Sequence, residues 1–171
     1  MEDLHHLPAD GNRYEISRGH LLVTPSPSMP HNVAAFELAR RLADQAPDQF
    51  RVVAPGIGLP LRHDVLYLPD LAVITAAAAR RRATVLYPDE VLLVAEVLSP
   101  SNAKDDLVEK RWGYAQAGIP AYWIVDPEKL TVTILTNDGH GDYTETTHAE
   151  PGQPLTLDFP FPLHLDPADL A

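Results

Sequence analysis

Two carboxylates stand in apolar stretches where an ionised side chain is costly to bury. Glu96 is the only polar residue of the run 91–98, and Asp70 lies in a second apolar stretch, 68–74. If the two stretches are neighbouring strands, the two negative charges repel each other unless one is protonated or a cation lies between them. Mg²⁺ or Mn²⁺, which prefer oxygen ligands, would resolve this conflict. Such a metal ion can activate a water molecule and stabilise charge on a phosphoryl oxygen.

A purely structural interpretation of the same two residues remains open. In it, Asp70 ends a loop after Pro69, and Glu96 forms a salt bridge with a basic residue of the following helix. Paired, hydrogen-bonded carboxylates of this kind are tolerated in protein interiors. The spacing of the residues does not separate this interpretation from the metal site.

Lys110 and His31 are the other residues whose types suit such a site. Lys110 falls in a helix predicted after Glu96, where its amine could stabilise charge in a transition state. Asp106 precedes it by four residues, however, and an exposed ion pair on the helix surface is the alternative. His31 starts a predicted helix after a proline-rich loop, and it could lie over the metal, contact a phosphate or be structural.

Three further carboxylates are predicted to be surface groups. They are Glu15, Glu37 and Asp89. Asp89 follows a proline, as Asp70 does, but it precedes its predicted strand, so we prefer Asp70 as the metal ligand. Whether Glu15 belongs to the site is left open by the sequence.

The elements that must position these residues follow from hydrophobic periodicity and from proline and glycine. The pattern predicts helices over 31–46 and 101–117, and a loop or single helical turn over 75–83. Strands are predicted over 50–54, 57–61, 65–74, 91–98 and 121–126. Hairpins are predicted at 14–23, around Arg18-Gly19, and at 130–147, around Asn137-Asp138-Gly139. The tail, 155–165, is expected to cover a sheet edge.

This order of elements predicts an α/β (α+β) fold with a mixed central sheet flanked by helices and with N-terminal and C-terminal hairpins. A length of 171 residues is typical of one domain, 1–171, which begins with a polar lead-in segment over 1–12.

Composition excludes several classes of protein. The formal charge of −11 does not favour tight constitutive binding to nucleic acid. The absence of cysteine excludes disulfides and thiolate metal sites, and it suits a cytoplasmic protein. No long apolar run or signal peptide indicates a membrane partner. No GxGxxG, P-loop or GxSxG motif occurs, so P-loop and serine-hydrolase chemistry have no support. Four aromatic residues are assigned to core packing rather than to base stacking: Trp112, Tyr114, Tyr122 and Trp123.

Several short motifs occur in an order that is specific as a set. They are Arg13-Tyr14-Glu15, Pro30-His31, Pro69-Asp70-Leu71, Glu96-Val97-Leu98-Ser99-Pro100-Ser101, Asp106 with Lys110, Tyr114, Gly118, and Tyr122-Trp123-Ile124-Val125-Asp126-Pro127. Over nearly its whole length the chain resembles the bacterial Uma-two family of restriction-endonuclease-like proteins, which belongs to the PD-(D/E)XK nuclease superfamily.

The resemblance implies a restriction-endonuclease-like fold and a set of roles. Asp70 and Glu96 would bind Mg²⁺, and the backbone carbonyl of Val97 would be a further ligand. The superfamily places a lysine two residues after the second acid, where this chain has Leu98. Lys110 on the next helix would be its substitute, and His31 would lie near the site.

Three hypotheses follow. The first is a Mg²⁺-dependent endonuclease that hydrolyses phosphodiester bonds in DNA. The second is a catalytically inactive nuclease-like module that binds a protein or nucleic-acid partner, which the missing lysine at Leu98 and the acidic charge favour. The third is a structural dimer whose carboxylates pair with Lys110 and Arg111. A homodimer is compatible with each hypothesis.

Overall fold

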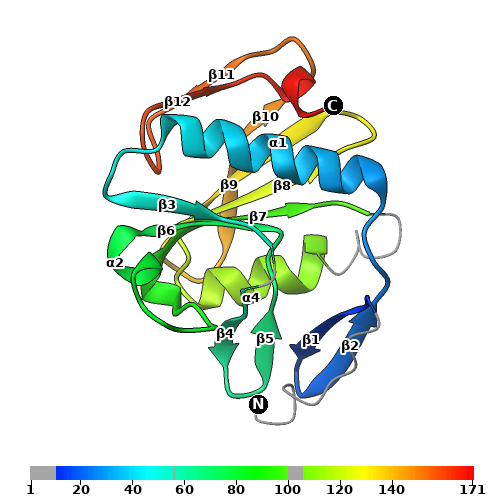
Figure 1. Cartoon of the computed structure of the whole chain (residues 1–171), viewed down its shortest axis with the longest axis vertical. Coiled ribbons are helices and arrows are strands. Elements are labelled where there is room, and N and C mark those ends of the chain that lie inside the picture. Colours follow the sequence, from blue (N-terminus) through cyan, green and yellow to red (C-terminus); the bar gives the residue numbers. More distant parts are fainter. Residues whose placement is uncertain (1–10, 56, 100–105) are drawn as a thin grey trace.

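The structure is a computed structural model that describes residues 11–55, 57–99 and 106–171. Most of the predicted lead-in segment, 1–12, and the start of the second predicted helix lie outside these residues. Figure 1 shows a central sheet covered by α1 on one side and by α4 and a group of short strands on the other.

The central sheet has six strands in the order β10-β9-β8-β7-β6-β3. Their bounds are β3 Phe50–Val53, β6 Leu71–Thr75, β7 Val91–Val97, β8 Ala121–Asp126, β9 Thr131–Asn137 and β10 Tyr143–Ala149. β7 and β8 are parallel and the remaining pairs are antiparallel, so the sheet is mixed. The helix α4, Arg111–Gln116, lies on the connection between the two parallel strands. This confirms the predicted fold class.

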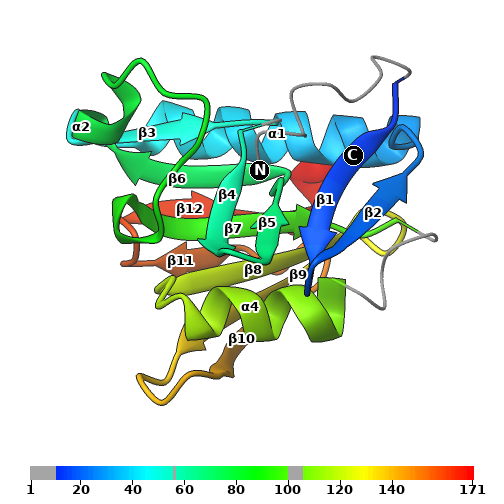
Figure 2. The same ribbon diagram turned by 90° about the horizontal axis from the view of Figure 1, so that it is seen from below.

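A second, four-stranded sheet has the order β2-β1-β5-β4. Its bounds are β1 Arg13–Ser17, β2 His20–Thr24, β4 Leu59–Arg62 and β5 Val65–Tyr67. Viewed from below, these strands lie in front of the central strands and cross them, on the same side as α4 (Figure 2). The N-terminal hairpin predicted around Arg18-Gly19 is therefore present, and it forms one edge of this sheet.

Alternation along the central strands divides the core into two layers, with one irregularity where the β6–β7 register shifts between Val73 and Ile74. On one face, α1 (Met29–Gln45) packs on the sheet together with the short strands β11 (Leu155–Leu157) and β12 (Leu163–Leu165). On the other face lie β4, β5 and α4. β11 and β12 pair only with each other in the described chain. The prediction that this tail covers a sheet edge is wrong, because it packs beside α1 on a face.

Two predicted elements differ from the structure. The single strand predicted over 65–74 is divided into β5 and β6, because Pro69 has no N–H to donate and the chain bends from Leu68 to Asp70. The second predicted helix begins in the described residues with a π-helical turn, Asp106–Lys110, and continues as α4. The short helix α2, Ala76–Ala79, agrees with the single turn predicted there.

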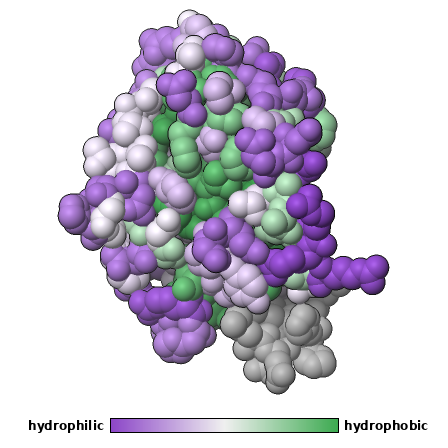
Figure 3. Space-filling view, turned by 90° about the vertical axis from the view of Figure 1, so that its left-hand side faces the viewer, coloured by the Kyte–Doolittle hydropathy of each residue, from purple (hydrophilic) through white to green (hydrophobic). Residues whose placement is uncertain are grey.

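The surface is mixed in polarity. Seen from the side on which α2 lies, an apolar strip crosses the middle of the face and hydrophilic side chains border it (Figure 3). Trp112 is 44% exposed, so its assignment to the core is wrong, whereas Tyr114, Tyr122 and Trp123 are buried as predicted. In the described part of the chain, no helix combines the length and the apolar character needed to span a bilayer.

Candidate active site

Asp70 and Glu96 lie at the same end of two adjacent antiparallel strands, β6 and β7. The register pairs Leu71 with Ala95, and one further step places Asp70 opposite Glu96. The backbone N–H of Val97 donates a hydrogen bond to Asp70 Oδ2 over 2.9 Å. Both carboxylates are buried. The structure therefore brings together the two acids that the sequence singled out.

Asp70 is surrounded by nitrogen donors. Arg13 Nη1 lies 2.5 Å from Asp70 Oδ1, and His31 Nε2 lies 3.0 Å from Oδ2. Burial by itself would raise the pKa of Asp70, but the hydrogen bond from His31, the charge of Arg13 and the N–H of Val97 hold this pKa well below its ordinary range. Asp70 is thus a carboxylate that stays ionised although it is buried.

Glu96 is held from α4 and the turn before it. Lys110 Nζ lies 3.1 Å from Glu96 Oε1, and the hydroxyl of Tyr114 donates to the same oxygen over 2.7 Å. Lys110 and Tyr114 are four residues apart, so they occupy the same face of the helical segment. Burial and the charge of Glu96 raise the pKa of Tyr114, which keeps its hydroxyl protonated and able to donate.

Lys110 also joins a third carboxylate to the cluster. Its Nζ lies 3.1 Å from Glu15 Oε1, and this oxygen accepts a second hydrogen bond from the backbone N–H of Leu68 over 2.7 Å. Glu15 and Lys110 are both buried. The prediction that Glu15 is a surface group is wrong, as is the alternative that Lys110 forms only an exposed ion pair. Glu37, paired with Arg40, and the exposed Asp89 lie elsewhere.

Strand β1 supplies charged groups that sequence reasoning did not assign to the site. Arg13, Glu15 and Ser17 alternate along the strand, so all three point to one side of it. Arg13 binds Asp70 and the carbonyl of Leu68, while Ser17 Oγ donates to Glu109 Oε2 over 2.7 Å. Charged side chains at alternate positions of a strand that must pack on a core would have indicated this role. Arg13 is the main residue that the sequence analysis missed.

Two residues after Glu96, this chain has Leu98 in place of a lysine. The Leu98 side chain packs partly buried against the apolar cluster beneath β4, β5 and α4. The nitrogen next to Glu96 comes instead from Lys110, fourteen positions further along the chain. The predicted role of the Val97 carbonyl as a metal ligand stays a prediction.

Asp70 and Glu96 offer carboxylate oxygens, the kind of donor that Mg²⁺ binds. In the described part of the chain, no three or more histidine, aspartate and glutamate side chains form a metal-binding group. Mg²⁺ is usually held by one or two carboxylates and completes its shell with water and substrate phosphate. The carboxylates of Asp70, Glu96 and Glu15 face the side-chain cations of Arg13 and Lys110. With His31 left out of the count, the cluster carries one net negative charge. Asp70 and Glu96 could therefore hold such an ion, in competition with Arg13.

Comparison with known proteins places the chain in a family. No curated protein matches the chain. Among solved structures it is similar to a protein from Anabaena variabilis ATCC 29413, described as "a putative nuclease belonging to DUF820". The two share 19% sequence identity with a TM-score of 0.79, over 99% of this chain and 95% of that chain, which establishes a common fold. The family predicted from the ordered motifs is confirmed by a family model that matches residues 1–168. The chain belongs to the Uma2 family, whose description is "Putative restriction endonuclease".

Proposed function

We propose that the protein is a metal-dependent endonuclease that hydrolyses phosphodiester bonds in DNA, with Asp70 and Glu96 as its metal ligands. The observation that carries the proposal is the pairing of these two buried carboxylates across β6 and β7, with Lys110 3.1 Å from Glu96. A Mg²⁺ or Mn²⁺ ion bound there would supply an activated water and stabilise charge on the phosphoryl group.

The surrounding residues would keep these ligands in place. His31 and the Val97 N–H fix the orientation of the Asp70 carboxylate, and Tyr114 fixes that of Glu96. Lys110 is the cation nearest to Glu96, and it would stabilise the negative charge that develops as the phosphodiester is attacked. The Arg13 side chain is 19% exposed, so it is the part of the cluster that an incoming phosphate meets first.

A second candidate function is a catalytically inactive nuclease-like binding module. The same cluster favours it in one respect, because Arg13 and Lys110 already compensate most of the carboxylate charge and Glu96 is 0% exposed. In this case the carboxylates and cations stabilise the junction of β1, β6 and β7, and the fold serves for recognition alone.

Plasmid cleavage separates the two candidates. Purified protein is incubated with supercoiled DNA in Mg²⁺ or Mn²⁺, with EDTA as the metal-free reference. We expect nicking that requires metal and that falls by at least roughly a hundredfold in Glu96→Gln. The matched control is Glu37→Gln, since Glu37 is an acid of α1 that pairs with Arg40 away from the cluster.

Two results would count against the nuclease proposal. One is the absence of cutting by the wild-type protein while calorimetry detects no Mn²⁺ binding, which favours the inactive module. The other is cutting by Glu96→Gln at the wild-type rate, which would assign any activity to a contaminant or to another site.

A further inference from the structure

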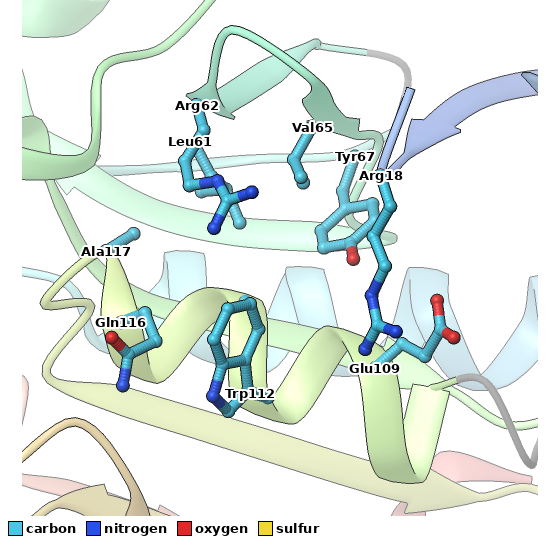
Figure 4. A pocket seen from close by; sticks show the side chains of 10 residues that line it. Arg18, Leu61, Arg62, Val65, Tyr67, Glu109, Trp112, Gln116 and Ala117 are labelled. Atoms are coloured by element: carbon cyan, nitrogen blue, oxygen red, sulfur yellow. The ribbon is translucent and has the colours of Figure 1, made fainter. Parts of the chain in front are cut away.

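A pocket lies between the β4–β5 hairpin and α4, next to the acidic cluster but outside it. Val65 and Tyr67 lie on its hairpin side (Figure 4). Gly113 lines it from the helix. A Cβ atom on Gly113 would lie 2.9 Å from Tyr67 Cε2, so the glycine allows the helix to approach the hairpin closely. The walls are apolar, and arginine and glutamate side chains stand at the rim.

Trp112 gives this pocket an accessible aromatic surface. Trp112 is 44% exposed, whereas the tyrosines of the apolar cluster on this face of the sheet are buried: Tyr67, Tyr114, Tyr122 and Tyr143. The Arg62 guanidinium lies 5.8 Å from the centre of the indole ring. Asp64 holds this guanidinium through two hydrogen bonds, of 3.1 Å and 2.9 Å. One planar cation is thus fixed against the ring, and the remaining ring surface is open to a ligand.

Arg18 supplies a positive charge at the rim. It occupies the tight turn between β1 and β2 with a φ of 50° and is exposed. Its side chain extends from the hairpin towards the Glu109 end of the pocket (Figure 4). Within the part of the chain that the structure describes, Arg18 has no hydrogen bond or ion pair, and Ser17 Oγ donates to Glu109 Oε2 at the same end of the pocket. This guanidinium is available to an anionic group.

The pocket and the acidic cluster share structural elements. Lys110 and Tyr114 contact Glu96 in the cluster. Glu109, Trp112 and the backbone of Gly113 line the pocket from the neighbouring face of the same helical segment. Tyr67 lies between the two sites, and its ring centre is 5.7 Å from Lys110 Nζ. Tyr67 and the helical segment that carries Lys110 therefore connect the pocket to the cluster.

We propose that this pocket holds one unpaired base of a nucleic-acid strand, which stacks on Trp112 while Arg18 contacts a neighbouring phosphate. Stacking on an exposed aromatic ring together with arginine contacts is the way proteins bind single strands without reading their sequence. A paired base inside a duplex presents no free face to the indole. The proposal takes its ligand class from the proposed nuclease function, and it narrows the substrate to single-stranded or locally opened nucleic acid.

Binding of a short fluorescein-labelled oligothymidylate to the full-length protein tests the proposal. EDTA is present throughout, so cleavage plays no part in the result. We expect the single strand to bind more tightly than the same sequence in a duplex, and Trp112→Ala to weaken binding roughly tenfold. Trp112→Phe keeps a ring and should restore most of the affinity. Arg18→Gln should weaken binding and reduce its dependence on salt.

The matched control is Tyr87→Ala. Tyr87 is 51% exposed, and Arg81 Cζ lies 4.8 Å from the centre of its ring. The two residues form a comparable aromatic–arginine pair outside the pocket. We expect this variant to bind as the wild type does. Tryptophan fluorescence gives a second readout, because Trp112 and the buried Trp123 are the only tryptophans of the chain. Oligothymidylate should quench the wild type and leave Trp112→Phe unchanged.

Three results would overturn the proposal: no binding of oligothymidylate by the wild type, equal affinity of wild type and Trp112→Ala, or equal affinity for strand and duplex. The outcome is independent of the nuclease test. Binding that depends on Trp112 in a protein that cuts no DNA supports the pocket and counts against the nuclease. Metal-dependent cutting without such binding overturns the pocket alone.

Discussion

The guanidinium of Arg13 lies 2.5 Å from the carboxylate of Asp70, although 57 positions separate the two residues in the sequence. The contact joins the N-terminal hairpin to the start of β6, beside the end of β7 that carries Glu96. It also gives Asp70 a positive partner that belongs to the protein. A metal ion that binds Asp70 through Oδ1 would therefore compete with Arg13 for that oxygen atom.

Replacement of Arg13 by glutamine should lower the stability of the metal-free protein and increase the stabilisation that a metal ion provides. In EDTA we expect the free energy of unfolding to fall by about 3 kcal/mol, because a buried carboxylate loses its cationic partner. With Mn²⁺, the variant should gain more stability than the wild type, since the metal no longer competes with a guanidinium. Urea denaturation with and without Mn²⁺ measures both effects.

The control for this experiment is Arg40→Gln. Arg40 pairs with Glu37 on the exposed side of α1, where solvent screens an ion pair and its loss changes stability little. A gain of stability from Mn²⁺ that is the same in wild type and Arg13→Gln would contradict competition at Asp70.

Lys110 should be essential for stability because it is shared by two buried acids. We expect Lys110→Met to lower the free energy of unfolding by about 3–5 kcal/mol, since Glu15 and Glu96 then face each other's charge without their common cation. The double variant Lys110→Met with Glu15→Gln should recover part of this loss, because one buried charge is removed. Urea denaturation of the single and double variants gives the coupling energy.

The comparison for Lys110 is Lys129→Met. Lys129 pairs with Asp126 at the surface, and its side chain is 76% exposed, so its loss should change stability far less than the loss of Lys110. A double variant whose loss of stability equals the sum of the losses in Lys110→Met and Glu15→Gln would mean that Glu15 and Lys110 are not energetically coupled.

The pKa of Asp70 predicts how the stability of the protein changes with pH. Because this pKa is held below the ordinary value of 3.8, the ionised carboxylate stabilises the folded state fully above that value. This contribution is lost as the pH falls through the lower pKa of the folded state. The difference in unfolding free energy between wild type and Asp70→Asn should thus be constant above about pH 5 and shrink in more acidic solution.

Urea denaturation in EDTA between neutral and acidic pH measures this difference. Asp138→Asn is the control, because Asp138 is exposed and its pKa is lowered mainly by the backbone N–H groups of His140 and Asp142. Its effect on stability should be much smaller. A difference for Asp70→Asn that grows towards acidic pH would show that the carboxylate is buried in its protonated form.

The sequence predicts the central part of the site for a physical reason. Glu96 stands in an otherwise apolar run and Asp70 follows a proline at the edge of another, so the cost of burying their charge directs attention to both. The parallel and antiparallel strands around them follow from periodicity and from the helix between β7 and β8. Lys110 suits the site by its residue type, although its spacing also fits an exposed pair with Asp106. The family resemblance favours the site, and the structure places Lys110 beside Glu96.

The residues contributed by β1 could not be predicted in the same way. Arg13 and Glu15 lie in a short polar strand whose partner in space, β5, follows fifty positions later, and no local pattern fixes that pairing.

The sequence assigns Trp112 to the core because aromatic residues near apolar runs usually pack there. The exposure of this face of the helix depends on the position of the β4–β5 hairpin, and the sequence of the helix does not reveal that position.

Gly113 should resist the substitution that helices usually favour. Glycine within a helix ordinarily costs roughly 1 kcal/mol relative to alanine, so Gly→Ala is often stabilising. Here the added methyl group would lie 2.9 Å from Tyr67 Cε2 and 3.2 Å from Leu61 Cδ1. We expect Gly113→Ala to lower the free energy of unfolding by about 1–3 kcal/mol, since the buried Tyr67 ring packs edge-on against Tyr114 and has little room to move. Because Tyr67 separates the pocket from Lys110, the same variant should also weaken oligothymidylate binding. A Gly113→Ala protein as stable as the wild type would mean that α4 and the hairpin pack less closely than the structure describes.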